Sequence, residues 1–235
     1  MNDQAAIKTQ LSHIHEQIES ACRQAGRPAD SVRLLLATKT VEPARIRLAI
    51  NAGETLIGEN KVQEYQQKAA DLADLSCERH FIGHLQTNKA KEVLKYVSCI
   101  QSVDRLSLAE KLNTLLKAED RKLSIYLQVN TSFEDSKFGC NPTEVYTLME
   151  QLQTLDALKV KGLMTIGLFS DDEKEVRKSY QLLREIREKG QQLGLLPAGQ
   201  LELSMGMSND LKWAIQEGAT MVRVGSAIFG NRIYT

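Results

Sequence analysis

Lys39 is the residue whose setting in this sequence most clearly suggests chemistry. It comes at the carboxyl end of a short apolar run, residues 32–40, which has the pattern of a strand buried on both faces. In sheets covered on both sides, ligands bind beyond the carboxyl ends of the strands, so we expect Lys39 to point into a site. A primary amine in such a pocket can condense with an aldehyde to form an imine, because partial desolvation and nearby cations increase its neutral, nucleophilic fraction.

Two stretches near the end of the sequence have the residue types that bind an anion. Ser208 follows a predicted strand at 201–207, and Gly225 and Ser226 follow another at 221–224. A glycine lets the backbone approach a ligand closely, and N–H groups at the start of a helix favour negative charge. Barrels of alternating strands and helices often bind phosphate after their last two strands. We therefore expect these three residues to form a phosphate site.

Composition limits the classes of function. With 235 residues, of which 42% are hydrophobic and 26% charged, the sequence predicts a single large domain over 1–235. Lysine plus arginine equals aspartate plus glutamate at 30 each, which argues against nucleic acid and anionic membranes as partners. The sequence contains neither a membrane-span-length apolar run nor a signal-peptide core, so we expect a cytoplasmic protein. The four cysteines form no C-x-x-C pair, and we expect no metal site.

The spacing of apolar runs predicts eight strand-plus-helix units. Such a series favours a closed α/β barrel, a single (β/α)8 TIM barrel with an extra N-terminal helix, over a doubly wound open sheet. The loop at 131–141, after the fifth strand, could gate a ligand or be an ordinary surface loop. Predicted strands are at 32–40, 55–60, 80–84, 99–103, 123–130, 160–165, 201–207 and 221–224, and predicted helices are near 4–25, 43–51, 61–73, 105–119, 142–154, 172–193 and 208–217.

Seven short motifs occur along the sequence in an order that resembles a known family. They are Ala37-Thr38-Lys39, Ile57-Gly58-Glu59-Asn60, the segment 80–89, Lys137-Phe138-Gly139, Gly162-Leu163-Met164, the segment 203–208 and Val222-Arg223-Val224-Gly225. Together they resemble the pyridoxal phosphate homeostasis protein family, the single-domain relatives of the alanine racemase barrel. The resemblance runs from about residue 30 to the end of the sequence, and it implies a fold type III barrel that binds pyridoxal 5'-phosphate (PLP).

The resemblance also implies roles for individual residues. Lys39 matches the family's cofactor lysine, which makes it the predicted Schiff-base residue for PLP. Arg223 matches an arginine that faces the pyridine ring, where a guanidinium, which in practice never gives up its proton, would keep the ring nitrogen unprotonated. A ring in that state is a weak electron sink and disfavours carbanion chemistry. Asn60, at the end of the second strand, is placed to hydrogen-bond the polar rim of PLP, whereas His84 is expected to be structural.

The function implied by the resemblance is that of a non-catalytic PLP carrier that buffers PLP or delivers it to PLP-dependent apo-enzymes. We separately expect the protein to be a monomer. A racemase-like enzyme is the main alternative, but racemisation needs a second acid/base group besides Lys39. In alanine racemase that group is a tyrosine associated with a carboxy-terminal β-domain, which we do not expect here because the sequence ends soon after the eighth strand. A third alternative is a barrel enzyme in which Lys39 forms a Schiff base with a sugar. The tyrosines that remain as candidate second bases are Tyr65, Tyr96, Tyr126, Tyr146, Tyr180 and Tyr234.

Overall fold

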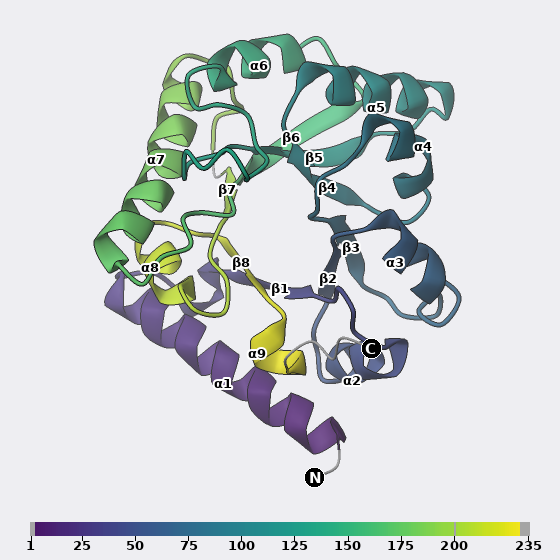
Figure 1. Cartoon of the computed structure of the whole chain (residues 1–235), viewed down its shortest axis with the longest axis vertical. Coiled ribbons are helices and arrows are strands. Elements are labelled where there is room, and N and C mark those ends of the chain that lie inside the picture. Colours follow the sequence, from purple (N-terminus) through teal and green to yellow (C-terminus); the bar gives the residue numbers. More distant parts are fainter. Residues whose placement is uncertain (1–2, 200, 231–235) are drawn as a thin grey trace.

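The computed structural model describes residues 3–199 and 201–230, and these form a closed barrel of parallel strands surrounded by helices (Figure 1). The strands follow one another in chain order, and β8 pairs with β1 to close the barrel. The predicted barrel is therefore confirmed, and the open sheet is excluded. The strands are β1 Arg33–Ala37, β2 Leu56–Glu59, β3 Glu78–Phe81, β4 Cys99–Val103, β5 Leu123–Gln128, β6 Leu158–Met164, β7 Glu202–Ser204 and β8 Met221–Val224.

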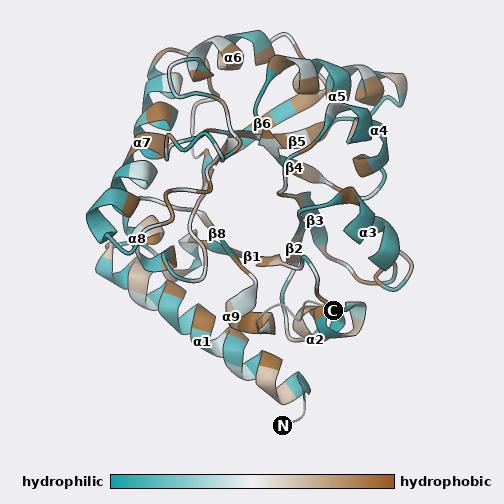
Figure 2. Ribbon diagram, in the orientation of Figure 1, coloured by the Kyte–Doolittle hydropathy of each residue, from teal (hydrophilic) through white to brown (hydrophobic). Residues whose placement is uncertain are grey.

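Helices cover the outside of the barrel. The predicted N-terminal helix is α1, which lies across α8 and also packs against α2 and α9 (Figure 1). Figure 2 shows hydrophobic and hydrophilic residues alternating along these helices, as expected where one face of a helix is buried. The α-helices are α1 Asp3–Gln24, α2 Pro43–Asn51, α3 Val62–Lys68, α4 Ala90–Val93, α5 Leu106–Ala118, α6 Val145–Leu152, α7 Glu173–Gln192, α8 Leu211–Gln216 and α9 Ser226–Phe229, with short 3-10 helices η1 Ala29–Ser31 and η2 Thr87–Lys89.

Several local predictions differ from the structure, in the bounds of elements and in short helices that were not expected. The first strand ends at Ala37 and not at residue 40, because Val41 N donates to Thr38 O at 3.0 Å and closes a turn. Lys39 therefore lies in this turn, just beyond the strand. No helix was predicted between the third and fourth strands, yet η2 and α4 lie there; both are too short to show a helical hydrophobic period. The four-residue α9 was missed for the same reason.

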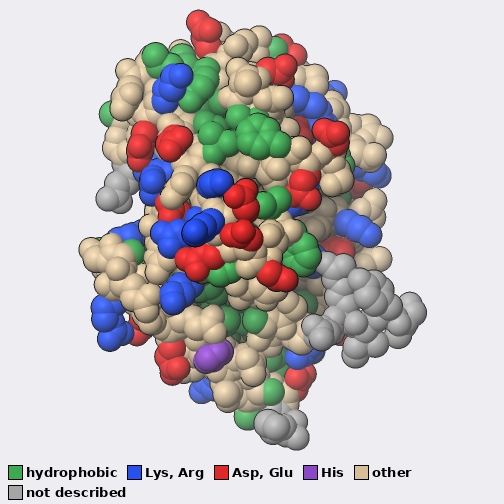
Figure 3. Space-filling model, turned by 60° about the vertical axis from the view of Figure 1, so that its left-hand side comes forward, with side chains coloured by type: hydrophobic (Ala, Val, Ile, Leu, Met, Phe, Trp, Pro, Cys, Tyr) green, Lys and Arg blue, Asp and Glu red, His purple; other side chains and the backbone are tan. Residues whose placement is uncertain are grey.

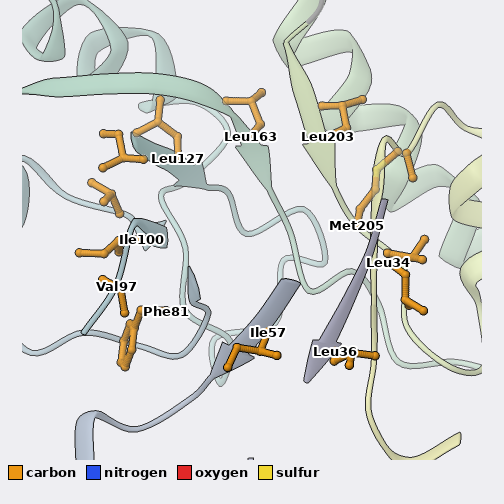
Figure 4. Close-up of a cluster of buried hydrophobic side chains, with 14 of the residues drawn as sticks. Leu34, Leu36, Ile57, Phe81, Val97, Ile100, Leu127, Leu163, Leu203 and Met205 are labelled. Atoms are coloured by element: carbon orange, nitrogen blue, oxygen red, sulfur yellow. The ribbon is translucent and has the colours of Figure 1, made fainter. Parts of the chain in front are cut away.

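The core has two layers, one inside the barrel and one between the barrel and the helices. Alternate residues of β1 divide between them: Leu35 belongs to the inner cluster, while Leu34 and Leu36 belong to the outer one. Figure 4 shows outer-layer side chains radiating away from the strands. Each fully buried leucine side chain contributes about 1.5–3 kcal/mol to the free energy of folding. On the face shown in Figure 3, acidic and basic side chains are interspersed, in keeping with the equal numbers of the two charges.

Candidate functional site

The carboxyl ends of β1, β2 and β8 bring three of the predicted site residues together. Ala37 pairs with Gly58 on one side, and Lys39 and Asn60 each follow this last pair by two residues. On the other side Leu36 pairs with Val224, which sets Gly225 beside Ala37. The approach at Gly225 is close, because a Cβ added there would lie 2.7 Å from the Ala37 carbonyl oxygen. Lys39, Asn60 and Gly225 therefore share one end of the barrel.

The two serines of the predicted anion site leave the barrel at the same end. Arg223 N donates to Gly206 O at 3.0 Å, so the segments that lead to Ser208 and to Ser226 run side by side. Ser208 is half-buried and Ser226 is exposed, and neither hydroxyl hydrogen-bonds another residue within 3–199 or 201–230. The N–H groups of Ser226 and Ala227 precede the first intrahelical bonds of α9, which run to Gly225 O. These groups can donate to an anion.

Arg223 is buried inside the barrel, with 6% of its surface exposed. Its Nη1 donates to Ser204 Oγ at 2.8 Å and its Nη2 to Thr165 O at 2.7 Å. Burial lowers its pKa, but a guanidinium remains charged at any physiological pH. Arg223 is thus a fixed cation held by neutral oxygen acceptors, as a residue that faces an unprotonated ring nitrogen would need to be.

A buried polar network, which the sequence analysis did not identify, anchors the turn that carries Lys39. Thr38 Oγ1 donates to Glu59 Oε1 at 2.8 Å, and Lys68 Nζ lies 2.8 Å from the same oxygen. Lys68 Nζ also donates to Thr38 O at 2.8 Å, the carbonyl that accepts Val41 N and closes the turn. The available signal was Glu59 itself, an acidic residue that follows an apolar run predicted to be buried.

Glu59 is fully buried, and its second carboxylate oxygen faces another acid. Burial, together with a hydrogen bond to Glu64, raises the pKa of Glu59 to about 8 against the opposing effect of Lys68. Glu59 Oε2 has no other hydrogen-bond partner among the described residues, whereas Oε1 is contacted by Thr38 and Lys68. Burial therefore disfavours the charged form of Glu59 even beside the ammonium group of Lys68.

His84 takes part in packing between loops at this end of the barrel. Its ring stacks on Phe138 with centroids 3.7 Å apart, and its Nδ1 lies 3.6 Å from Asp104 Oδ2. Phe138 belongs to the 131–141 loop, which is tied down where Lys137 Nζ donates to Gly167 O at 2.7 Å. These contacts agree with the structural role predicted for His84, while a gating role for the loop stays a prediction.

The five described tyrosines among the candidates for a second acid/base group have their hydroxyls engaged or lie outside the barrel wall. Tyr65 OH donates to His80 O at 2.7 Å, Tyr126 OH to Glu202 Oε2 at 2.7 Å and Tyr180 OH to Asp210 Oδ2 at 2.8 Å. Burial raises the pKa of all three hydroxyls. In the outer layer, Tyr96 stacks on Tyr65 and Tyr146 lies under Lys189, while Tyr234 lies outside the described residues.

Neither a metal-binding cluster nor a membrane-spanning helix is present within residues 3–199 and 201–230. No group of three or more histidine, cysteine, aspartate or glutamate side chains within these ranges could hold a metal ion. No described helix has the length and apolar character needed to cross a membrane.

Comparison with known proteins decides the family. The model of the family "Alanine racemase, N-terminal domain" matches residues 9–232. A pyridoxal phosphate homeostasis protein from Aquifex aeolicus is 41% identical over 226 residues, which cover 95% of this chain and 97% of that protein. The chain belongs to the pyridoxal phosphate homeostasis protein family. Its human member is 35% identical and is matched over 90% of its own length and 100% of this chain. The resemblance seen in the sequence is therefore confirmed.

Solved structures of the family agree with the fold. PipY of Synechococcus elongatus, whose structure has PLP bound, superimposes with a TM-score of 0.83 and 33% identity over 95% of this chain and 100% of that chain. Alanine racemase from Corynebacterium glutamicum has a TM-score of 0.74 at 14% identity, covering 97% of this chain and 62% of the racemase. At that identity the likeness to the racemase shows a shared barrel fold.

Proposed function

We propose that this protein binds PLP and holds it as a Schiff base on Lys39. The observation that carries the proposal is the placement of Lys39 at the same barrel end as Gly225, with the buried cation of Arg223 inside the barrel on β8, two residues before Gly225. Lys39 Nζ would attack the aldehyde carbon, a C=N bond would replace the C=O bond, and the oxygen would leave as water. PLP bound to the related PipY, and the name shared by the relatives, support this choice of aldehyde.

The remaining groups of PLP have matching partners at this end of the barrel. Ser208 and Ser226 offer hydroxyls without partners among the described residues, and Gly225 allows the close backbone approach that a phosphate needs. Arg223 would face the ring nitrogen and keep it unprotonated. Asn60, which like Lys39 follows the last β1–β2 pair by two residues, would hydrogen-bond the polar rim of the ring. The residues present therefore fit PLP.

The biological role we propose is PLP homeostasis in the cytoplasm, by buffering PLP or delivering it to PLP-dependent apo-enzymes. Imine formation is reversible, so one site can both store the aldehyde and release it. We further propose that the protein is a monomer without robust catalysis. The hydrogen bonds from Tyr126 and Tyr180 to carboxylates support the absence of robust catalysis, because each hydroxyl already donates to another group.

One set of measurements on the PLP-loaded protein tests the proposal. The absorbance spectrum is recorded before and after borohydride, the reduced adduct is located by peptide mass mapping, and racemase activity is assayed on the same sample. We expect an imine band, an adduct on Lys39 and no turnover. Lys39→Ala should lose the band, whereas Lys61→Ala, an exposed lysine beside Asn60, should keep it. An unchanged band in Lys39→Ala would refute the assignment, and robust turnover would refute the carrier role.

A further inference from the structure

Four polar side chains lie inside the barrel, where layers of branched apolar residues are usual. His80, Gln101, Ser204 and Arg223 come from β3, β4, β7 and β8, and their exposed surface is 1%, 0%, 0% and 6%. The inner apolar cluster around them has only six buried members. Burying polar groups costs free energy unless each finds a hydrogen-bond partner, so the contacts among these four side chains need an explanation.

The four side chains form a continuous series of hydrogen bonds through the barrel. Arg223 Nη1 is 2.8 Å from Ser204 Oγ, Ser204 Oγ is 2.7 Å from Gln101 Oε1, and Gln101 Nε2 is 2.7 Å from His80 Nδ1. His80 Nε2 then lies 3.4 Å from Glu78 Oε2, at the first residue of β3. We call this series, from Arg223 to Glu78, the axial chain. It leads from the carboxyl end of the barrel towards the amino end.

The chemistry of the members gives the axial chain one direction. A guanidinium can only donate hydrogen bonds, so Ser204 Oγ must accept one from Arg223. The Ser204 hydroxyl then donates its own O–H to Gln101 Oε1. The amide of Gln101 then presents its oxygen to Ser204 and its NH₂ group to His80. His80 Nδ1 must accept, which places the imidazole proton on Nε2, facing the Glu78 carboxylate.

The surroundings of His80 favour this neutral form. Burial lowers the pKa of His80, while the hydrogen bond with His80 and the nearby Arg33 hold the pKa of Glu78 at about 2. The charged groups near the imidazole are Glu78 on β3, Arg33 on β1 and Lys161 on β6, and the Tyr126 ring on β5 packs beside it. Arg33 also donates to Glu78 Oε1 at 2.6 Å, which fixes the far end of the axial chain.

We propose that Ser204, Gln101 and His80 are positioning residues that hold Arg223 in place for the bound PLP ring. This inference rests on the proposed function, in which Arg223 faces the ring nitrogen. Ser204 pairs with Met221, two residues before Arg223, so the axial chain holds the guanidinium from the amino-terminal side. Within the described part of the chain, both hydrogen-bond acceptors of Arg223 are neutral oxygens, so no directly bonded carboxylate there cancels its charge, which can act on the ligand.

The test uses protein loaded with PLP that carries ¹⁵N at the ring nitrogen, whose chemical shift reports protonation. Ser204→Ala and Gln101→Met each interrupt the axial chain. We expect both to move the ring-nitrogen signal towards the protonated position and to weaken PLP binding about tenfold, the effect of losing the support of one charge-assisted hydrogen bond. Tyr126→Phe is the matched control, because it removes a 2.7 Å bond to Glu202 within the inner cluster and outside the axial chain. It should leave the ring-nitrogen signal unchanged.

The outcomes separate this inference from the proposed function. If Arg223→Gln moves the ring-nitrogen signal but Ser204→Ala and Gln101→Met do not, the positioning role is overturned while the Arg223 assignment stands. If Arg223→Gln moves nothing, the contact between Arg223 and the ring fails, and the inference fails with it. NMR of the imidazole nitrogens of His80 in the wild-type protein gives a second readout that needs no variant to fold. A proton on Nε2 supports the direction of the axial chain, and a proton on Nδ1 overturns it.

Discussion

Lys68 and Glu59 meet in a buried contact, with Nζ 2.8 Å from Oε1, directly behind the residue that precedes Lys39. The Thr38 hydroxyl donates to Glu59 Oε1, and Lys68 Nζ donates to the Thr38 carbonyl oxygen. The turn that presents Lys39 is thus attached to α3 as well as to its own strand. A lysine that must meet an aldehyde benefits from this, because a fixed backbone limits the positions that its amine can reach.

Replacing Lys68 with methionine should destabilise the protein by about 3 kcal/mol, because it leaves the buried Glu59 carboxyl and the Thr38 carbonyl without the ammonium group that contacts both. Urea denaturation at neutral pH measures the change. Lys117→Met is the matched control, since Lys117 pairs with Asp156 at 2.7 Å but both side chains are more than half exposed. Its effect should stay below about 1 kcal/mol. A similar small loss in Lys68→Met would contradict a structural role for the buried pair.

Stability should depend on pH through Glu59. Its pKa rises from 4.5 to about 8 on folding, so between these values the folded protein holds a proton that the unfolded chain releases. The stabilisation from this proton is fully present below pH 4.5 and is lost as the pH rises to about 8. Urea denaturation of the wild type and of Glu59→Gln at several pH values measures it. The difference between the two proteins should change by a few kcal/mol across this window. A constant difference would show that the pKa of Glu59 does not shift on folding.

The sequence was sufficient to predict the barrel and the end of it at which the candidate site residues meet. Apolar runs closed by small polar residues mark strands, and a closed parallel barrel collects all their carboxyl ends in one place, so Lys39, Asn60 and Gly225 could be grouped without coordinates. The resemblance to the family supplied the ligand. Short helices such as α4 were not predicted, because four residues are too few to show the hydrophobic periodicity of a helix.

The polar networks behind the site could not be predicted in the same way. Gln101 contacts His80 across 21 positions of sequence and Ser204 across 103, and both contacts depend on strand register and on which faces meet inside the barrel. The spacing of residues along one strand shows which of them share a face of the sheet. It does not show the register in which neighbouring strands pair. Glu59 and Lys68, nine positions apart, meet only because α3 folds back on β2.

Removing both proposed phosphate ligands, in the double variant Ser208→Ala with Ser226→Ala, should weaken PLP retention about 100-fold, because two hydrogen bonds to a charged group are lost. The imine band should persist at saturating PLP, since Lys39 is untouched. Equilibrium dialysis and absorbance measure the two properties on one sample. Ser98→Ala with Ser124→Ala is the matched control, as these serines lie near the amino ends of β4 and β5. Equal affinity in the two double variants would refute the phosphate site.

Gly225→Ala should lower the affinity for PLP while leaving the protein folded. The new Cβ would lie 2.7 Å from Ala37 O, so β8 and β1 must separate slightly at the end that carries the site, at a cost of about 1–3 kcal/mol. We expect PLP affinity to fall at least tenfold. Gly218→Ala is a control at the amino-terminal end of β8: its φ of +102° makes alanine strained, but the nearest atom is 3.6 Å away. That variant should lose stability and keep its affinity for PLP. If Gly225→Ala kept full affinity despite the same loss of stability, the close approach of β8 to β1 would have no part in holding the ligand.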